Sequence, residues 1–174
     1  MGYRVAFEQW VPFPLEQVFL FFANPNNLPR IMPPASGAKL LKLDLIPPVG
    51  VSSATPLAGA GSAIVVSVRV VPFLPIRAPW VARIVEFAWN DHFVDIQEKG
   101  PFQNWHHRHQ FAAEVRNGIS GTLVSDIVDY EIGFGPLGAL AQKLFVASQM
   151  QRTFVHRQKI LESLLSQDCS IEVK

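Results

Sequence analysis

Cysteine and charge are both scarce in this sequence. Cys169 is the single cysteine among 174 residues, so no disulfide can form within the chain and an oxidising compartment is not indicated. Charged residues make up 17% of the chain, below the roughly 25% of typical soluble proteins, which argues against a disordered chain. The 15 basic and 14 acidic residues nearly cancel, so the chain lacks the excess positive charge that binds nucleic acid.

Long hydrophobic runs and targeting signals are missing as well. The longest apolar stretches are broken by charged residues or prolines, and none reaches the roughly 18 residues that a transmembrane helix needs. The first ten residues alternate in polarity and lack the apolar core of a signal peptide. We therefore expect a cytoplasmic protein. The length suits a single domain, which we place at residues 1–166, with a frayed tail over residues 167–174.

Familiar catalytic motifs are absent too. The sequence contains no G-x-G-x-x-G, no G-x-x-x-x-G-K-[ST], no G-x-S-x-G and no H-E-x-x-H. Cys169 lies in the expected tail, away from the structured base that a catalytic cysteine requires. The sequence thus leans away from an enzyme without deciding the question.

The apolar pattern predicts one strand, two short helices, six further strands and one long helix. Helices are expected over residues 15–22, 25–31 and 137–165, and strands over 3–11, 39–46, 63–71, 77–87, 93–98, 105–115 and 120–132. Residues 47–61 contain three prolines and three glycines and are expected to form a mobile loop. Consecutive strands joined by tight turns predict an α+β fold with an antiparallel sheet that curves around the long helix.

The richest stretch in chemistry runs from Trp105 to Phe111 and includes three histidines. In a strand, His107 and His109 share a face with Trp105 and Phe111, and these bulky residues mark that face as the inner one. His106 then faces solvent. Two histidines at positions i and i+2 provide no evident third ligand, so we expect neither a metal nor another cofactor.

The Asn117-Gly118 pair is the strongest hairpin signal in the chain and fixes a register. If these two residues form the turn, directly opposed residues have numbers that sum to 235. His109 then faces Asp126, and Trp105 faces Tyr130, with Cβ atoms about 5 Å apart. On the preceding strand, Asp95 shares a face with Phe93.

Three interpretations of these inward polar residues stay open. They could form a satisfied polar network that fixes strand register, they could contact a ligand, or they could catalyse proton transfer. In the catalytic case His109 is the acid or base, and Asp126 orients it and raises its pKa.

The aromatic content and the long helix are relevant to whether side chains fill the interior or leave a cavity. The chain has 13 phenylalanines and four tryptophans, which fill a core in most proteins and here could also line a cavity. The long helix has a polar interval that includes Gln149, between two apolar stretches. This pattern fits a helix over a polar-lined space, and equally a helix with one exposed turn.

Several segments carry a resemblance to a known family, and they span most of residues 3–165. They are the segments 19–28 (FLFFANPNNL), 80–84 (WVARI), 93–95 (FVD), 100–102 (GPF) and 135–138 (GPLG), together with Trp105, His107, His109, Phe111, Asp126 and Tyr130. The sequence resembles the SRPBCC superfamily, which has the helix-grip fold of START lipid-transfer domains, the birch-pollen allergen group and polyketide cyclases. It is most similar to bacterial ligand-binding SRPBCC proteins.

The resemblance implies a cavity between the sheet and the C-terminal helix, with residues 47–61 as one gate. We therefore expect the protein to bind or carry a hydrophobic small molecule, such as a lipid, a polyketide or an aromatic compound. A cyclase or aromatase that uses His109 and Asp126, and a regulator that acts through protein contacts, are the alternatives. The sequence leaves homodimerisation open. From the strand faces, the candidate ligand-binding residues are Trp80, Ile84, Phe93, Asp95, Trp105, His107, His109, Phe111, Asp126, Tyr130, Phe145 and Gln149.

Overall fold

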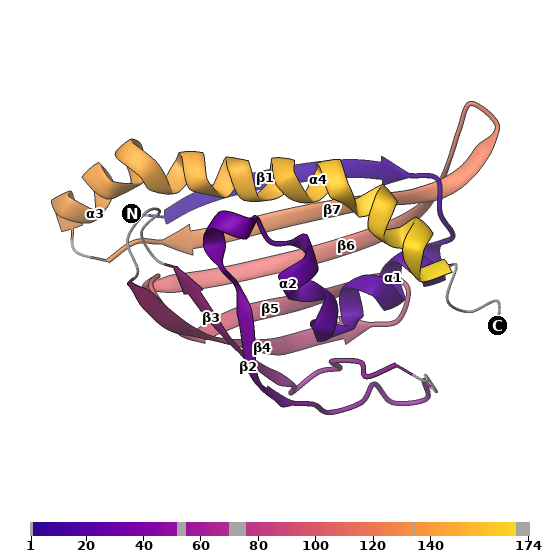
Figure 1. The fold of residues 1–174 in the computed structure, drawn as a ribbon, viewed down its shortest axis with the longest axis horizontal. Coiled ribbons are helices and arrows are strands. Elements are labelled where there is room, and N and C mark those ends of the chain that lie inside the picture. The colour runs from indigo at the N-terminus through magenta and orange to yellow at the C-terminus, as the bar shows by residue number, and fades with distance from the viewer. Residues whose placement is uncertain (1, 52–54, 70–75, 134, 170–174) are drawn as a thin grey trace.

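Seven strands form one antiparallel sheet in the computed structural model, which describes residues 2–51, 55–69, 76–133 and 135–169. The strands are β1 (Gly2–Val11), β2 (Lys39–Asp44), β3 (Ala63–Arg69), β4 (Arg77–Ala88), β5 (His92–Lys99), β6 (Asn104–Arg116) and β7 (Ile119–Glu131). Their order in the sheet is β1-β7-β6-β5-β4-β3-β2, so the first strand lies beside the last (Figure 1). The expected α+β fold with a curved antiparallel sheet is confirmed.

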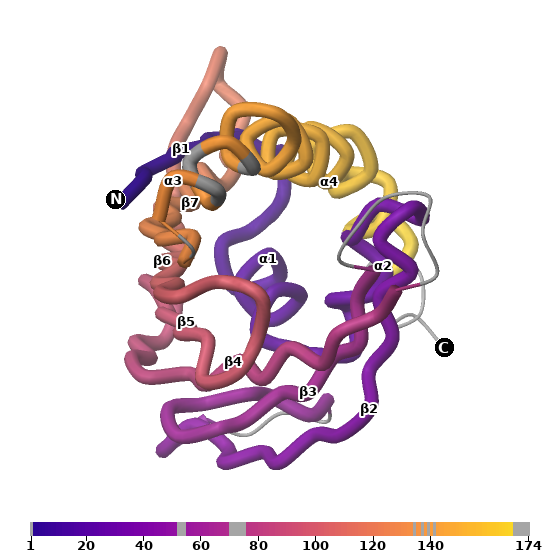
Figure 2. Tube along the Cα trace, turned by 90° about the vertical axis from the view of Figure 1, so that its left-hand side faces the viewer, coloured from indigo at the N-terminus to yellow at the C-terminus, as the bar shows by residue number. Residues whose placement is uncertain are grey.

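The helices gather on the concave face of this sheet. They are α1 (Leu15–Ala23), α2 (Leu28–Ile31), α3 (Gly135–Ala141) and α4 (Ala147–Cys169), with short 3-10 turns at Pro25–Asn27 and Pro34–Ser36. Figure 2 shows the sheet curving around α1, with α4 lying across the open side. None of the helices in the described ranges is long and apolar enough to cross a membrane.

The C-terminal helix differs from its prediction in two respects. A five-residue π-helical segment, η3 (Gln142–Val146), separates α3 from α4, so residues 137–165 are not one regular helix. The helix also continues to Cys169, which makes residues 167–169 helical instead of part of a frayed tail. Two contacts lie at this end: an ion pair of 2.9 Å between Arg30 of α2 and Asp168, and a hydrogen bond that Gln17 of α1 donates to the carbonyl of Leu165.

The expected loop over residues 47–61 contains no helix or strand in its described part. Its last residues are packed, however. Leu57 and Ala58 are buried, and the amide of Ala58 donates a hydrogen bond of 3.0 Å to the carbonyl of Ala23 at the end of α1. The turn expected at residues 72–75 lies outside the described residues.

The β6–β7 hairpin has the predicted register. Asn117 and Gly118 have φ values of 51° and 78°, as the two central residues of a type I′ turn require. Arg116 pairs with Ile119, and the register continues to Trp105 opposite Tyr130. His109 therefore faces Asp126, and His106 is exposed, as predicted.

The larger cluster of buried apolar residues lies between α1, the sheet and the C-terminal half of α4. Phe19 is fully buried, and its ring makes edge contacts with Phe87, Phe93 and Phe111 at centroid distances of 5.4, 6.1 and 5.1 Å. Leu161 of α4 belongs to the same cluster and is also fully buried. This packing fixes one end of α4 on the sheet and leaves the other end to cover a different part of the concave face.

We predict that Leu161→Ala lowers the free energy of unfolding by about 2–5 kcal/mol, because it removes buried contacts and leaves a cavity in the core. Urea denaturation of the two proteins measures the difference. Val115→Ala is the matched control, since Val115 is 66% exposed near the hairpin turn. Equal losses in the two variants would contradict this account of how α4 is anchored.

Candidate functional site

A cavity of about 510 Å³ lies between the concave face of the sheet, α1, α2 and the N-terminal half of α4. Most of its lining is apolar and comes from elements far apart in the sequence. The apolar lining residues include Phe22, Leu28, Ile31, Ile64, Val66, Trp80, Ile84, Phe102, Trp105, Met150 and Phe154. One wall is polar, and it is built from β5, β6 and α4.

The structure brings most of the sequence-predicted site residues to this cavity. Those that line it are Trp80, Ile84, Phe93, Asp95, Trp105, His107, His109, Phe145 and Gln149. Phe111 is not among the lining residues, because it packs against Phe19 in the core. Asp126 lies behind the histidines and is 1% exposed, while the Tyr130 hydroxyl accepts a hydrogen bond from Gln142. A role in ligand binding stays a prediction for all of them.

Asp126 contacts both inward histidines, not His109 alone. His107 Nε2 lies 3.0 Å from Asp126 Oδ1 and forms a hydrogen bond with it. His109 Nδ1 lies 2.9 Å from the same oxygen, but it is not aligned for a hydrogen bond, so this contact is electrostatic. The cross-strand register that the sequence predicts thus produces a shared carboxylate behind two imidazole rings.

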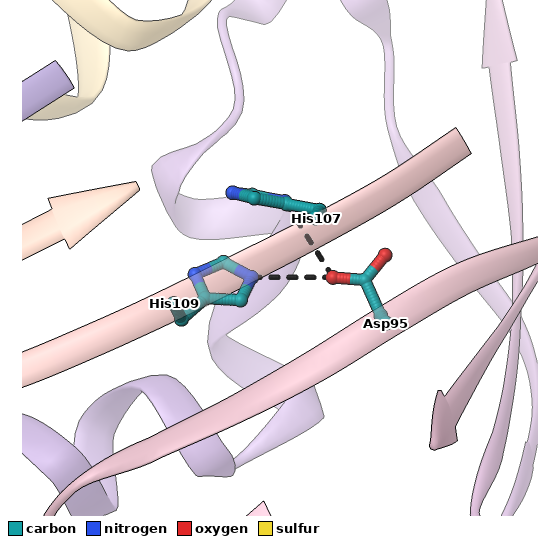
Figure 3. Close-up of side chains that lie close together, drawn as sticks. All are labelled: Asp95, His107 and His109. Atoms are coloured by element: carbon teal, nitrogen blue, oxygen red, sulfur yellow. Dashed lines mark hydrogen bonds and ion pairs between the residues drawn. The ribbon is translucent and has the colours of Figure 1, made fainter. Parts of the chain in front are cut away.

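Asp95 of β5 faces the same two rings from the other side (Figure 3). Its Oδ2 atom lies 3.2 Å from His109 Nε2 and 3.5 Å from His107 Nδ1. Its Oδ1 atom accepts a hydrogen bond of 3.2 Å from the indole N–H of Trp105. Each imidazole therefore lies between two carboxylates. Asp126 is buried behind the rings, and Asp95 lines the cavity.

Arg157 is the member of this site that the sequence reasoning missed. It projects from α4, and its guanidinium donates two hydrogen bonds to the carboxylate of Asp126, one of them 3.1 Å long. It also lies over the rings of Phe22 and Phe154, at 5.3 and 4.6 Å from their centroids. A signal was available, because Arg157 falls three residues after Phe154 and four before Leu161, on the buried stripe of the helix.

The pKa values of the network follow from burial and from these partners. Burial alone would raise the pKa of Asp126, but Arg157 and the two histidines hold it well below its usual range. Burial likewise opposes ionisation of Asp95, and the hydrogen bond from His109 and the charges of both histidines outweigh it and lower its pKa.

The two histidines differ in the direction of their shifts. Burial lowers the pKa of His107, and the neighbouring His109 lowers it further. For His109 burial acts in the same direction, yet its contacts with Asp126 and Asp95 raise its pKa overall. The wall therefore holds two carboxylates, one guanidinium and two imidazoles with unequal proton affinity.

This arrangement offers two kinds of chemistry. The polar wall can hydrogen-bond to a polar group of a molecule whose apolar part fills the cavity. Within the described part of the chain, one group of side chains also has donor atoms close enough to hold a metal ion. The group comprises Asp95, His107 and His109, whose donor atoms lie within 4.8 Å of one another.

A second hollow, of about 580 Å³, opens on the surface at the end of the sheet where β1 begins. It is more open than the cavity beneath α4. Its polar side chains include Arg4 and Asp129, which pair with each other at 2.6 Å, and Asn104, which donates a hydrogen bond to Glu131. We assign the candidate site to the cavity beneath α4, because the buried polar network lies there.

Comparisons with known proteins agree with this architecture. The family model described as polyketide cyclase / dehydrase and lipid transport matches residues 11–159. No curated protein matches the sequence.

Solved structures share the fold at low sequence identity. TTHA0849 from Thermus thermophilus is 18% identical, with a TM-score of 0.64, over 95% of this chain and 99% of that one. A START superfamily protein from Mycobacterium smegmatis is 16% identical, with a TM-score of 0.62, over 94% and 97%. The di-domain ARO/CYC BexL from the BE-7585A biosynthetic pathway is 15% identical, with a TM-score of 0.64, over 93% of this chain and 49% of that one.

We predict that Arg157→Met lowers the free energy of unfolding by about 3–5 kcal/mol, because it leaves the carboxylate of Asp126 buried without its counter-charge. Methionine keeps much of the apolar volume, so the change mainly removes charge. Thermal and urea denaturation provide the measurement.

Arg4→Met is the matched control for this prediction. Arg4 pairs with Asp129 on the same strand as Asp126, but its side chain is 71% exposed, so we expect little change in stability. A similar, small effect of both substitutions would show that the buried ion pair does not hold α4 on the sheet.

Proposed function

Because this chain belongs to the polyketide cyclase / dehydrase and lipid transport family, we propose that it binds a hydrophobic small molecule in the cavity beneath α4. The family assignment also confirms the resemblance to the SRPBCC superfamily that the sequence motifs indicated. The observation that carries the proposal is a cavity of about 510 Å³ with a mostly apolar lining and one polar wall. Cavities of roughly 300–1,000 Å³ suit small organic ligands.

The apolar side of the cavity favours a ligand with an aromatic or polycyclic body. Trp80 and Trp105 lie edge to face at a centroid distance of 4.8 Å, and Phe102 contacts both rings. Indole and phenyl faces in this arrangement offer flat surfaces for stacking and large areas for apolar contact. A molecule that fills this space would also exclude water from the polar wall.

The polar wall favours a ligand that carries a hydroxyl or carbonyl group at one end. Asp95, His107, His109 and Arg157 all reach the cavity surface from that side. Donors and acceptors fixed in this way orient a bound molecule. Its polar group loses hydrogen bonds with water on entering the cavity, and these side chains replace them. We therefore propose an oxygenated hydrophobic compound, held with its polar end at the histidines.

Catalysis by His109 and Asp126 in the manner of a cyclase stays a prediction. His109 lies at the cavity surface, whereas Asp126 is covered, with the two imidazoles and Arg157 between it and the cavity. Binding is the function that the cavity supports without any further assumption about a reaction.

We predict that freshly purified protein carries, or takes up, one hydrophobic small molecule per chain. Native mass spectrometry followed by denaturation and organic extraction detects a molecule that co-purifies. Titration with the neutral fluorophore 1-aminoanthracene then measures binding directly, because Trp80 and Trp105 line the cavity and their fluorescence reports its occupancy.

The matched variants place the larger side chain inside or outside the cavity. Ala82→Phe, on the inner face of β4, fills the space and should weaken 1-aminoanthracene binding by at least about 10-fold, since one lost anchor contact of about 1.4 kcal/mol has that effect. Val85→Phe adds the same ring at a residue that is 42% exposed and should leave binding unchanged. Absence of both a co-purifying molecule and saturable binding, or equal binding in the two variants, would refute the proposal.

A further inference from the structure

Three metal-ligand side chains converge on the surface of the polar wall. His107 and His109 project from the inner face of β6, and Asp95 faces them from β5, which is its neighbour in the sheet (Figure 3). One donor atom from each residue lies within 4.8 Å of the others. The sequence spacing revealed two of these residues as a pair, and the pairing of β5 with β6 supplies the third.

The two imidazoles lie closer to the carboxylate of Asp126 than to that of Asp95. Toward Asp126 the ring nitrogens lie 3.0 and 2.9 Å from the carboxylate. Toward Asp95 they lie 3.5 and 3.2 Å away. The 3.2 Å contact of His109 is a long hydrogen bond, and the 3.5 Å contact of His107 is an electrostatic contact only.

These longer distances match the separation of two ligands that share a metal ion. Zinc–nitrogen and zinc–oxygen bonds are about 2.0–2.2 Å long, so two ligands at the tetrahedral angle lie about 3.4 Å apart. The separations of 3.5 and 3.2 Å between the imidazole nitrogens and Asp95 Oδ2 bracket this value. The third separation, between the two imidazole nitrogens, is within 4.8 Å, so the rings would rotate to bring all three donor atoms to one ion.

The surroundings of the three residues are those of metal ligands in proteins. Metal-binding histidines usually donate their other ring N–H to a carboxylate, which fixes the orientation of the ring. Asp126 forms this hydrogen bond with His107 and lies 2.9 Å from Nδ1 of His109 without the alignment of a hydrogen bond, and it is itself fixed by Arg157. The ligand carboxylate is held as well, because Trp105 donates a hydrogen bond to its other oxygen.

Charge and donor type narrow the class of metal. Arg157 balances the charge of Asp126, so Asp95 gives the ligand set a single negative charge alongside two imidazoles. Two nitrogen donors and one carboxylate suit divalent first-row transition metals, whereas Ca²⁺ and Mg²⁺ prefer oxygen ligands throughout.

We propose that Asp95, His107 and His109 form a three-residue binding site for a divalent transition-metal ion of the Zn²⁺ type. All three residues line the cavity, so the remaining coordination positions of the ion face the space beneath α4. A polar group of a molecule in the cavity could then coordinate the ion. The metal site itself does not rest on the proposed function, because it is built from protein side chains and is tested without an organic ligand.

Calorimetric titration of the chelator-treated full chain with Zn²⁺ tests this proposal. We expect one ion per chain. Asp95→Ala should weaken binding by more than about 100-fold, since loss of a partner behind the ligands already costs about 10–100-fold. The control is His92→Ala, which removes an imidazole that lies 2.6 Å from Asp91, away from the cavity, and it should leave Zn²⁺ affinity unchanged.

The Co²⁺ complex of the unaltered protein gives a second readout that does not depend on the folding of a variant. Co²⁺ bound by two imidazoles and a carboxylate in a four- or five-coordinate site should absorb visible light strongly. The weak spectrum of hydrated Co²⁺ would overturn the proposal. Zn²⁺ binding that persists unchanged in Asp95→Ala, that is lost in His92→Ala, or that is absent from the unaltered protein would overturn it as well.

Discussion

The ion pair between Asp126 and Arg157 is the contact on which the arrangement of this interior depends. It joins β7 to α4, two elements that meet across the concave face, and both side chains are buried. A buried charge without its partner costs several kcal/mol, so this pair strongly disfavours positions of α4 that separate the two groups. The same carboxylate also contacts His107 and His109 from behind. One interaction thus positions the helix over the sheet and fixes the two imidazoles at the cavity surface.

The pair also separates two parts of the interior with different properties. On one side, α1 and the C-terminal half of α4 close a dense aromatic and aliphatic core around Phe19 and Leu161. On the other, the N-terminal half of α4 covers a cavity that the side chains of Trp80 and Trp105 line but do not fill. A molecule in this cavity would have an apolar surface on most sides and a polar one at the histidines. The polar wall therefore supplies orientation, and the apolar lining supplies the free energy of burial.

The sequence predicted local features well, because hairpin geometry follows from a few residues. Asn117-Gly118 defined the β6–β7 register, and that register placed His109 opposite Asp126 and turned His107 inward. Arg157 was missed because its contact depends on how α4 lies across the sheet, and no local pattern sets that angle. Asp95 was assigned to the inner face, but its closeness to both imidazoles required the β5–β6 pairing. The Arg30–Asp168 pair is likewise a tertiary contact, between α2 and α4, that helical propensity does not predict.

A double-mutant cycle of Asp126→Asn and Arg157→Met, followed by urea denaturation, tests the central role of the buried pair most directly. Either single substitution leaves one buried charge without its partner. The second substitution removes that unpaired charge. The double variant should then be more stable than the sum of the single losses implies, with a coupling free energy above about 1 kcal/mol. Additivity within about 0.5 kcal/mol would contradict the account, because it would mean that α4 and the histidines keep their positions without this interaction.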